Sequence, residues 1–294
     1  MNNIRFFIIY LCIFIFVSCK SKITLPKPAH IIIVVEENHG YDQITGSQNA
    51  PYINKLSKEG TLFTNSEAIT HPSQPNYLAL FSGSTQGIDG DECLDKKTPF
   101  ITPNLGAALI HAGYTFKGYS ESLPKAGSLE CFYEESKGYD YARKHAPWVN
   151  WQGDKKNGLP DSTNQPFSDF PTDFNKLPTV SFVIPNEGND MHNIDLDGDT
   201  AAVKRADQWL KDHISAYLDW AKKNNSLLII TFDEDEKASS FENHIATIFV
   251  GPMVKQALNG SSINHYNVLR TIEGMYHLSS SGDADAEAIT GIWK

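Results

Sequence analysis

The sequence is poor in cysteine and in basic residues. Only four of its 294 residues are cysteine, none in a Cys-x-x-Cys spacing, which argues against a zinc ribbon or a thioredoxin-type redox site. Lysine and arginine number 25 against 35 aspartate and glutamate residues, giving a formal charge of −10. A chain this acidic is poorly suited to phosphate backbones, so we expect no nucleic-acid binding patch. The 11% of aromatic residues argues against a disordered chain.

The N-terminus carries the pattern of a secretory signal. Arg5 is the only charge in residues 1–18, where the apolar run 6–17 is too short to span a bilayer comfortably. Residues 16–19 resemble a bacterial lipobox, which predicts cleavage before Cys19 and a lipid on its sulfur. We therefore expect a signal peptide at 1–18, a lipid-anchored tether at 19–28, and an exported bacterial lipoprotein, membrane-anchored in the periplasm or at the cell surface. An ordinary signal peptide cut nearby is the alternative.

Two cysteines remain once these assignments are made. Cys12 leaves with the signal and Cys19 carries the lipid, so only Cys93 and Cys131 are left in the body of the chain. An exported protein is exposed to oxidising conditions. The two either form a disulfide or stay as buried free thiols, and the sequence leaves both readings open.

The mature chain alternates strand and helix patterns. The β-branched run 30–35 is typical of a strand buried on both faces, and further strands are expected at 61–68, 114–119, 179–184, 227–232 and 245–250. Helices are expected at 51–59, 75–81, 103–112, 200–223 and 266–276. This alternation predicts an α/β sheet with helices on both faces. Without a repeat or a composition break, residues 29–294 are expected to form one domain.

One segment departs from this alternation. Residues 124–178 are rich in Gly, Pro, Asn, Asp and Trp and have weak periodicity. We interpret them as a long irregular insertion with functional loops, in which Trp148 and Trp151 are candidates for shaping a substrate pocket.

Polar side chains follow three of the expected strands. In open α/β sheets the ligand site lies beyond the carboxyl ends of the strands. Clustered carboxylates repel one another and raise one another's pKa unless a cation neutralises them, and oxygen ligands suit Mg, Mn or Ca. A solvated acidic loop is the alternative for any one cluster, and it is the favoured reading for Asp235 and Glu236. The three sets are Glu36, Glu37 and Asn38; Asn189, Asp190 and His192; and Asp233, Glu234, Asp235 and Glu236.

Ser73 is the candidate nucleophile. It lies between an expected strand and an expected helix, where helix amides and the dipole favour a bound anion. A serine at such a position is often only an N-cap. The alternative elbow of a serine hydrolase has no support, because residues 83–87 lack the Gly-x-Ser-x-Gly spacing.

Six strings in consistent order across nearly the whole mature chain resemble the phosphoesterase family of bacterial acid phosphatases and phospholipases C, a branch of the alkaline phosphatase superfamily. The strings are VVEENH at 34–39, THPSQPNY at 70–77, YARKHAPW at 141–148, NDMH at 189–192, TFDED at 231–235 and INHYNVLR at 263–270.

The resemblance implies a fold and a chemistry. It implies an alkaline-phosphatase-like, three-layer α/β/α sandwich with a mainly parallel central sheet, in which a Ser hydroxyl attacks phosphorus beside one divalent cation. By position, Ser73 matches the nucleophile, while His145 and His192, supported by Asp190, match residues that hold phosphate or protonate the leaving group. His71, His244 and His265 lie in matching stretches with no assigned role, and a structural hydrogen bond is an equal reading for each. The metal-binding matches are Glu37, Asn38, Asp233 and Glu234, and Glu234 replaces an Asp of some members.

These residues predict a metal-dependent phosphoric-ester hydrolase. Phosphoryl transfer depends on positioning and charge stabilisation, which a cation and a histidine pair supply. The expected substrate is a small phosphomonoester, cleaved by a monomer through a phosphoserine intermediate. A phosphodiesterase or phospholipase C is the alternative, and a non-catalytic, lipid-anchored binding protein is a third reading.

Overall fold

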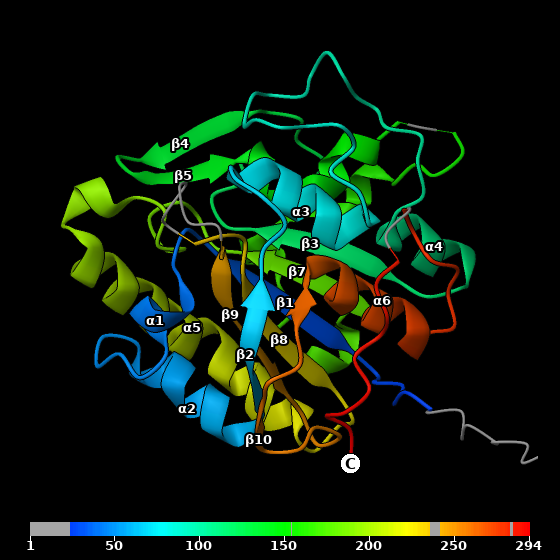
Figure 1. The fold of residues 1–294 in the computed structure, drawn as a ribbon. Coiled ribbons are helices and arrows are strands. Elements are labelled where there is room, and N and C mark those ends of the chain that lie inside the picture. The colour runs from blue at the N-terminus through cyan, green and yellow to red at the C-terminus, as the bar shows by residue number, and fades with distance from the viewer. Residues whose placement is uncertain (1–23, 154, 236–241, 283–284) are drawn as a thin grey trace, which may run out of the picture.

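A nine-stranded sheet forms the centre of the molecule (Figure 1). The computed structural model describes residues 24–153, 155–235, 242–282 and 285–294; the predicted signal peptide with Cys12, the lipid site Cys19, and Glu236 lie outside these ranges. The strand order is β10 (Ala257–Asn259), β2 (Thr61–Glu67), β9 (His244–Val250), β8 (Leu227–Phe232), β1 (Ile31–Glu36), β7 (Val180–Ile184), β3 (Phe116–Ser120) and β6 (Asn164–Pro166), with β11 (Ile263–Asn264) also paired to β2.

All pairings in this sheet are parallel except those of β9, which runs antiparallel to both β8 and β2. The mainly parallel sheet that the sequence predicted is therefore confirmed. The carboxyl ends of β1, β7 and β8 lie side by side, because β1 is hydrogen-bonded to both of the others. This places the polar residues that follow the three strands in one region.

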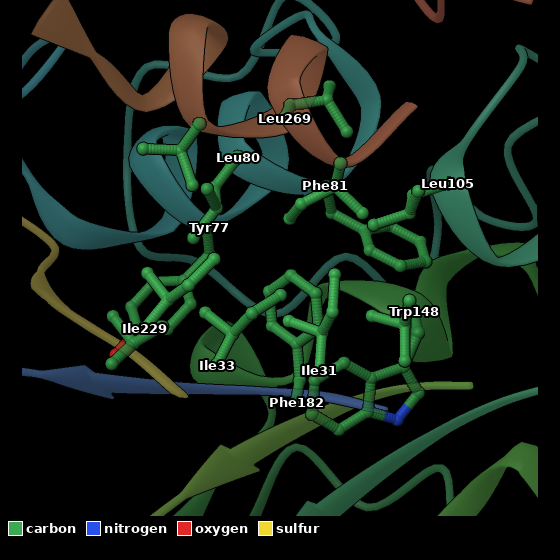
Figure 2. Packing of buried hydrophobic residues seen from close by; sticks show 14 of the residues in the cluster. Ile31, Ile33, Tyr77, Leu80, Phe81, Leu105, Trp148, Phe182, Ile229 and Leu269 are labelled. Carbon is green, nitrogen blue, oxygen red and sulfur yellow. The ribbon is translucent and has the colours of Figure 1, made fainter. Parts of the chain in front are cut away.

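Helices cover both faces of the sheet and complete the three layers (Figure 1). Alternate residues of β1 enter opposite cores: Ile31, Ile33 and Val35 pack in one, while Ile32 and Val34 pack in the other. The first core (Figure 2) includes residues of α3 (Ser73–Ser82), α4 (Leu105–His111) and α6 (His265–Met275). The second includes residues of α1 (Tyr41–Ile44), α2 (Pro51–Glu59) and α5 (Asp199–Ala221).

The expected strands and helices all appear, most within one or two residues of their predicted ends. Helix α4 is shorter than expected at 105–111, and α3 begins two residues earlier than expected, at Ser73. The segment 124–178 is more structured than the sequence indicated. It forms a hairpin of β4 (Phe132–Ser136) and β5 (Tyr139–Ala142), the edge strand β6, and five short 3₁₀ turns: η1 (Arg143–His145), η2 (Pro147–Trp151), η3 (Asp161–Thr163), η4 (Phe167–Asp169) and η5 (Phe174–Lys176).

The two tryptophans of this segment belong to the core, which corrects the expectation that they shape a pocket. Trp148 and Trp151 are fully buried, and their ring N–H groups donate to Asn164 Oδ1 and to the Thr102 carbonyl. Gly118 on β3 leaves room for Trp148, because a Cβ there would lie 2.0 Å from the indole ring. An aromatic side chain this large stabilises the core mainly by the apolar area that it buries.

Cys93 and Cys131 form a disulfide, with their Cα atoms 5.7 Å apart, which resolves the alternative that the sequence left open. The bond joins the loop after α3 to the start of the β4–β5 hairpin. Within the described residues, none of the helices has the length and apolar character needed to cross a membrane.

Candidate active site

Backbone hydrogen bonds join the loops that leave β1, β7 and β8. Glu37 N donates to the Asp190 carbonyl at 2.8 Å, and Asp233 N donates to the Glu36 carbonyl at 3.0 Å. Asn38 N donates to Asp233 Oδ1 at 3.0 Å, with Asn38 at a positive φ of 51°. Three segments far apart in sequence are thereby fixed at one end of the sheet, as the strand pattern predicted.

Ser73 is the first residue of α3 and does not act as its N-cap. The cap position is held by Pro72, and Asp91 accepts the Gln74 amide at 2.9 Å. Asn76 fixes the preceding loop, because its side chain accepts from the amides of Ile69 and Thr70 and donates to the carbonyls of Thr70 and Pro72. The Ser73 hydroxyl is thus left for the strand-end carboxylates.

The Ser73 hydroxyl lies between two carboxylates. Its Oγ is 3.1 Å from Glu37 Oε2 and 3.1 Å from Glu234 Oε1, and it can donate to either. Glu37 also accepts from the Tyr77 hydroxyl at 2.6 Å, and Tyr77 lies one turn further along α3. The helix therefore supplies both the candidate nucleophile and a group that orients its neighbour.

Burial is the main cause of the raised pKa values of the carboxyl groups around Ser73. It raises the pKa of Glu37 to about 8 and, together with the nearby Asp233 charge, that of Glu234 to about 9. Burial and the Glu37 charge also hold the pKa values of Asp190 and Asp233 well above their ordinary range. Four carboxyl groups are thus concentrated where water is excluded, and each opposes ionisation of another.

The residues fit a divalent cation at this position. Asp190 Oδ2 and Asp233 Oδ2 are buried and accept no hydrogen bond from the described part of the chain. Buried carboxylate oxygens without donors are costly unless a positive charge compensates them. A bound cation would reverse the pKa shifts by stabilising the ionised forms. The predicted ligands Glu37, Asn38, Asp233 and Glu234 offer oxygen donors of the kind that Mg, Mn or Ca takes.

The predicted histidines lie on the far side of Glu37 from Ser73. His145 Nε2 is 3.0 Å from Glu37 Oε1, and its Nδ1 is 3.6 Å from Asp190 Oδ2. His192 lies next to it, with the ring centroids 5.8 Å apart, and its backbone N donates to Asp190 Oδ1 at 2.9 Å. One ligand atom from each of Glu37, His145 and His192 can be chosen so that all three lie within 4.8 Å of one another.

The two imidazoles differ in exposure. His145 is fully buried, and burial with the nearby Lys144 and His192 charges holds its pKa well below the ordinary value. The His192 side chain is 27% exposed. His145 is therefore suited to a neutral, orienting role, whereas His192 is placed to meet a substrate that enters from solvent.

The structure places the three unassigned histidines. His71 Nδ1 is 2.5 Å from Glu234 Oε2, so His71 adjoins the Ser73 site. His265 Nε2 is 2.8 Å from the Asp233 carbonyl oxygen and supports that loop from α6. His244 stacks on Tyr41 with a centroid distance of 4.5 Å, which is a packing role.

Two charged neighbours of the site were not among the predicted residues. Lys144 Nζ lies 3.2 Å from Asp91 Oδ2 and 3.2 Å from His192 Nε2. Burial lowers the pKa of Lys144, but the charges of Glu37, Asp91 and Glu187 outweigh it and raise the pKa to about 12. Lys144 lies within the string at 141–148 and Asp91 lies outside the motifs, and their pairing arises only in the folded chain.

Comparison with known proteins shows relatives over most of the chain. The profile of the Phosphoesterase family matches residues 47–279. A phosphatidylinositol-3-phosphatase of Mycobacterium tuberculosis is 47% identical over 92% of this chain and 84% of its own length. An acid phosphatase of Aspergillus fumigatus is 30% identical over 86% of this chain, which spans only 56% of the fungal protein.

Solved structures share the fold at low sequence identity. An alkaline phosphatase superfamily protein of Vibrio parahaemolyticus aligns with a TM-score of 0.59 at 13% identity, covering 86% of this chain and 67% of the other. A putative sulfatase of Bacteroides thetaiotaomicron aligns with a TM-score of 0.61 at 13% identity, covering 90% and 74%. The chain is therefore a phosphoesterase: it belongs to the Phosphoesterase family and has the fold of the alkaline phosphatase superfamily.

Proposed function

We propose that the chain hydrolyses phosphomonoesters with Ser73 as the nucleophile and one divalent cation as cofactor. The observation that carries this proposal is the position of the Ser73 hydroxyl, at the first turn of α3 and 3.1 Å from both Glu37 and Glu234. A serine held against buried carboxylates can pass its proton to one of them as its oxygen attacks phosphorus.

The chain's own residues account for each bond change. Ser73 Oγ forms a bond to phosphorus as the bond from phosphorus to the alcohol oxygen breaks, which leaves a phosphoserine. His192, exposed at the edge of the cluster, supplies the proton that the departing alcohol needs. Water then attacks phosphorus and passes a proton to His192, and inorganic phosphate leaves as the carboxylate returns the proton to Ser73. His145, between Glu37 and Asp190, orients the group of carboxylates.

The cation would be held by Glu37, Asn38, Asp233 and Glu234, and when bound it would neutralise phosphoryl oxygens and lower the Ser73 pKa. Mg, Mn or Ca suits these oxygen donors. The buried Asp233 Oδ2, which accepts no hydrogen bond from the described residues, supports this assignment.

A second candidate substrate is a phosphate carried by an inositol lipid. The supporting observation is the name of the 47% identical relative, a phosphatidylinositol-3-phosphatase. A phosphodiester is the alternative class of substrate. The same centre would serve it, provided that the site has room for a second substituent on phosphorus.

The decisive experiment assays the purified protein against a phosphomonoester and a phosphodiester, with metal removed by chelation and with Mg, Mn or Ca restored. We expect hydrolysis of the monoester, loss of at least about 10²-fold on chelation, and recovery with a divalent ion. Full activity of a verified metal-free sample would exclude the cation. Preferred cleavage of the diester would replace the monoesterase proposal.

We also propose that the protein is an exported lipoprotein and that it acts as a monomer. The Cys93–Cys131 disulfide supports export, because disulfides persist mainly in oxidising compartments. Mass spectrometry of the membrane fraction tests the lipid on Cys19, and light scattering of the purified protein tests the oligomeric state.

A further inference from the structure

A cavity of about 270 Å³ lies between the loop after α3 and the β4–β5 hairpin. The Cys93–Cys131 disulfide, Leu94, Phe132 and Ala142 form its apolar wall, while Gln74 and Lys144 are on the side of the Ser73 site. The volume is just below the range of roughly 300–1,000 Å³ found for small-molecule sites. The cavity therefore has room for one ring-sized group.

The cavity adjoins the candidate active site. Gln74 follows Ser73 directly in α3, and Lys144 lines the cavity while its Nζ is 3.2 Å from His192 Nε2. Glu187 also lines it, with Oε1 3.9 Å from His192 Nδ1. His192 is the group that we propose protonates the departing alcohol, so this alcohol would be released next to the cavity.

The charged side chains that line the cavity have no net charge. Arg143 and Lys144 are opposed by Asp91 and Glu187, and Lys144 is already paired with Asp91 at 3.2 Å. A second anionic group would meet two carboxylates, while a cation would meet Lys144 and Arg143. This balance favours an uncharged ligand.

Polar atoms remain for such a ligand. Arg143 is 5% exposed and its Nη atoms donate to Leu129 O, Thr98 Oγ1 and Asn150 Oδ1. Its Nε is fully buried and does not open onto the cavity. Hydroxyl groups of a ligand can accept from Lys144 and donate to Asp91 and Glu187.

We propose that this cavity is the leaving-group subsite and that it holds an uncharged, hydroxylated ring, a sugar or a cyclitol, esterified to the phosphate. The apolar wall meets the C–H faces of the ring, and Lys144, Asp91 and Glu187 meet its hydroxyls. The proposal rests on the proposed function, because the ring is the alcohol that the phosphoesterase releases.

The disulfide keeps the two sides of the subsite together. Cys93 is two residues from Asp91, and the Cys131 carbonyl accepts the Arg143 amide at 3.0 Å. The cross-link thereby ties the loop with Asp91 to the segment that carries Arg143 and Lys144. A preformed subsite of this kind loses less entropy when the ring binds.

The test compares two aliphatic phosphomonoesters, myo-inositol 1-phosphate and ethyl phosphate, in the wild type and in Ala142→Leu, which fills the cavity. We expect kcat/KM for the inositol ester to fall at least about tenfold, mainly through KM, with ethyl phosphate changed less than about twofold. Ala108→Leu is the matched control, because Ala108 lines a different cavity beside residues 277–281, and it should leave both values unchanged.

Equal losses on both esters, or no loss on either, would overturn the subsite. A wild type that cleaves neither ester would instead contradict the proposed function. If Ala142→Leu lowers the melting temperature, Phe132→Ala replaces it, because Phe132 is 52% exposed and its loss should raise KM for the inositol ester alone.

Two further substrates distinguish the sources of the ring. Glucose 6-phosphate tests a sugar, and phosphatidylinositol 3-phosphate in phosphatidylcholine vesicles tests the same cyclitol on a lipid. The source is the substrate whose KM is lowest in the wild type and rises most in Ala142→Leu. If no ring ester has a lower KM than ethyl phosphate, the proposal fails.

Discussion

Two buried acidic regions of this molecule have opposite arrangements. On α6, Glu273 is 1% exposed, yet each of its oxygens has a donor: Arg270 Nη1 at 2.6 Å and Ser281 N at 2.7 Å. At the strand ends, Glu37, Asp190, Asp233 and Glu234 are also buried. Asp190 Oδ2, Asp233 Oδ2 and Glu234 Oε2 accept no hydrogen bond in the described chain, although Glu234 Oε2 forms an ion pair with His71. The first region carries its own cation, whereas the second has the chemistry of a site that receives one.

Burial alone therefore does not identify an active site. Burial raises the pKa of Glu273 as it does those of Glu37 and Glu234. What distinguishes the strand-end cluster is the number of carboxylates and the shortage of donors. Four variants and conditions test this contrast.

Ser73→Ala should have the largest effect, a loss of kcat of at least about 10³-fold. The hydroxyl is the group that attacks, so its removal leaves only positioning and charge stabilisation. Activity is measured on the preferred monoester, and metal content and circular dichroism should match the wild type. Substantial residual turnover would remove Ser73 from the mechanism.

Glu37→Gln should lower kcat/KM by about 10²-fold or more, because it removes a proposed cation ligand and the Ser73 partner. The metal-free variant should unfold at no lower denaturant concentration than the metal-free wild type, since Gln replaces a carboxyl group whose ionisation burial already opposes. Denaturant titration of both proteins checks this. A marked loss of stability would show that Glu37 is structural, like Glu273.

Glu273→Ala should produce the reverse result. It leaves Arg270 and the Ser281 amide without their buried partner, so the free energy of unfolding should fall by about 2–4 kcal/mol. Activity per folded molecule should stay within about twofold of the wild type, measured at a temperature where the variant remains folded. A loss of activity without a loss of stability would contradict the difference proposed between the two acidic regions.

The smallest effect concerns pH. The pKa of Glu273 in the folded state is raised by burial above 4.5, so the folded state binds its proton more tightly than the unfolded state does. Its contribution to stability is therefore fully present below pH 4.5 and decreases as pH rises through the folded pKa. The unfolding free energy of the wild type, relative to Glu273→Gln, should decrease from pH 4 to 7. An increase in this unfolding free energy difference over that range would contradict a raised pKa for Glu273.

Much of the fold follows from local sequence patterns. Continuous β-branched runs such as 31–35 give buried parallel strands, and the periodic apolar positions of 200–223 give α5. The β4–β5 hairpin was missed because every residue of β4 is exposed, so no alternating apolar pattern marks it. Strands β6, β10 and β11 are only two or three residues long, too short for a periodic signal.

The candidate site was predictable only in part. Strand ends and the family motifs pointed to Ser73, Glu37 and the other predicted site residues, which the fold does bring together. Lys144 and Asp91 were not foreseen, because their pairing joins segments 53 residues apart and depends on the hairpin and the disulfide. Tyr77 lies inside a motif, but its bond to Glu37 requires the packing of α3 against β1.

The alternation of β1 has a consequence for how this site can change. Ile33 and Val35 face α3, whereas Ile32 and Val34 face the opposite layer. The strand ends at Glu36, and Glu37 follows it directly. Glu37 reaches Ser73, whereas the charges felt by Glu36 are those of Asp207 on α5, of Glu37 and of Glu121. A one-residue deletion within Ile31–Ile33 would exchange the faces of the two glutamates while leaving the net charge and the string at 34–39 unchanged. The face of the sheet to which each residue of β1 points is therefore as important to the site as the identity of that residue.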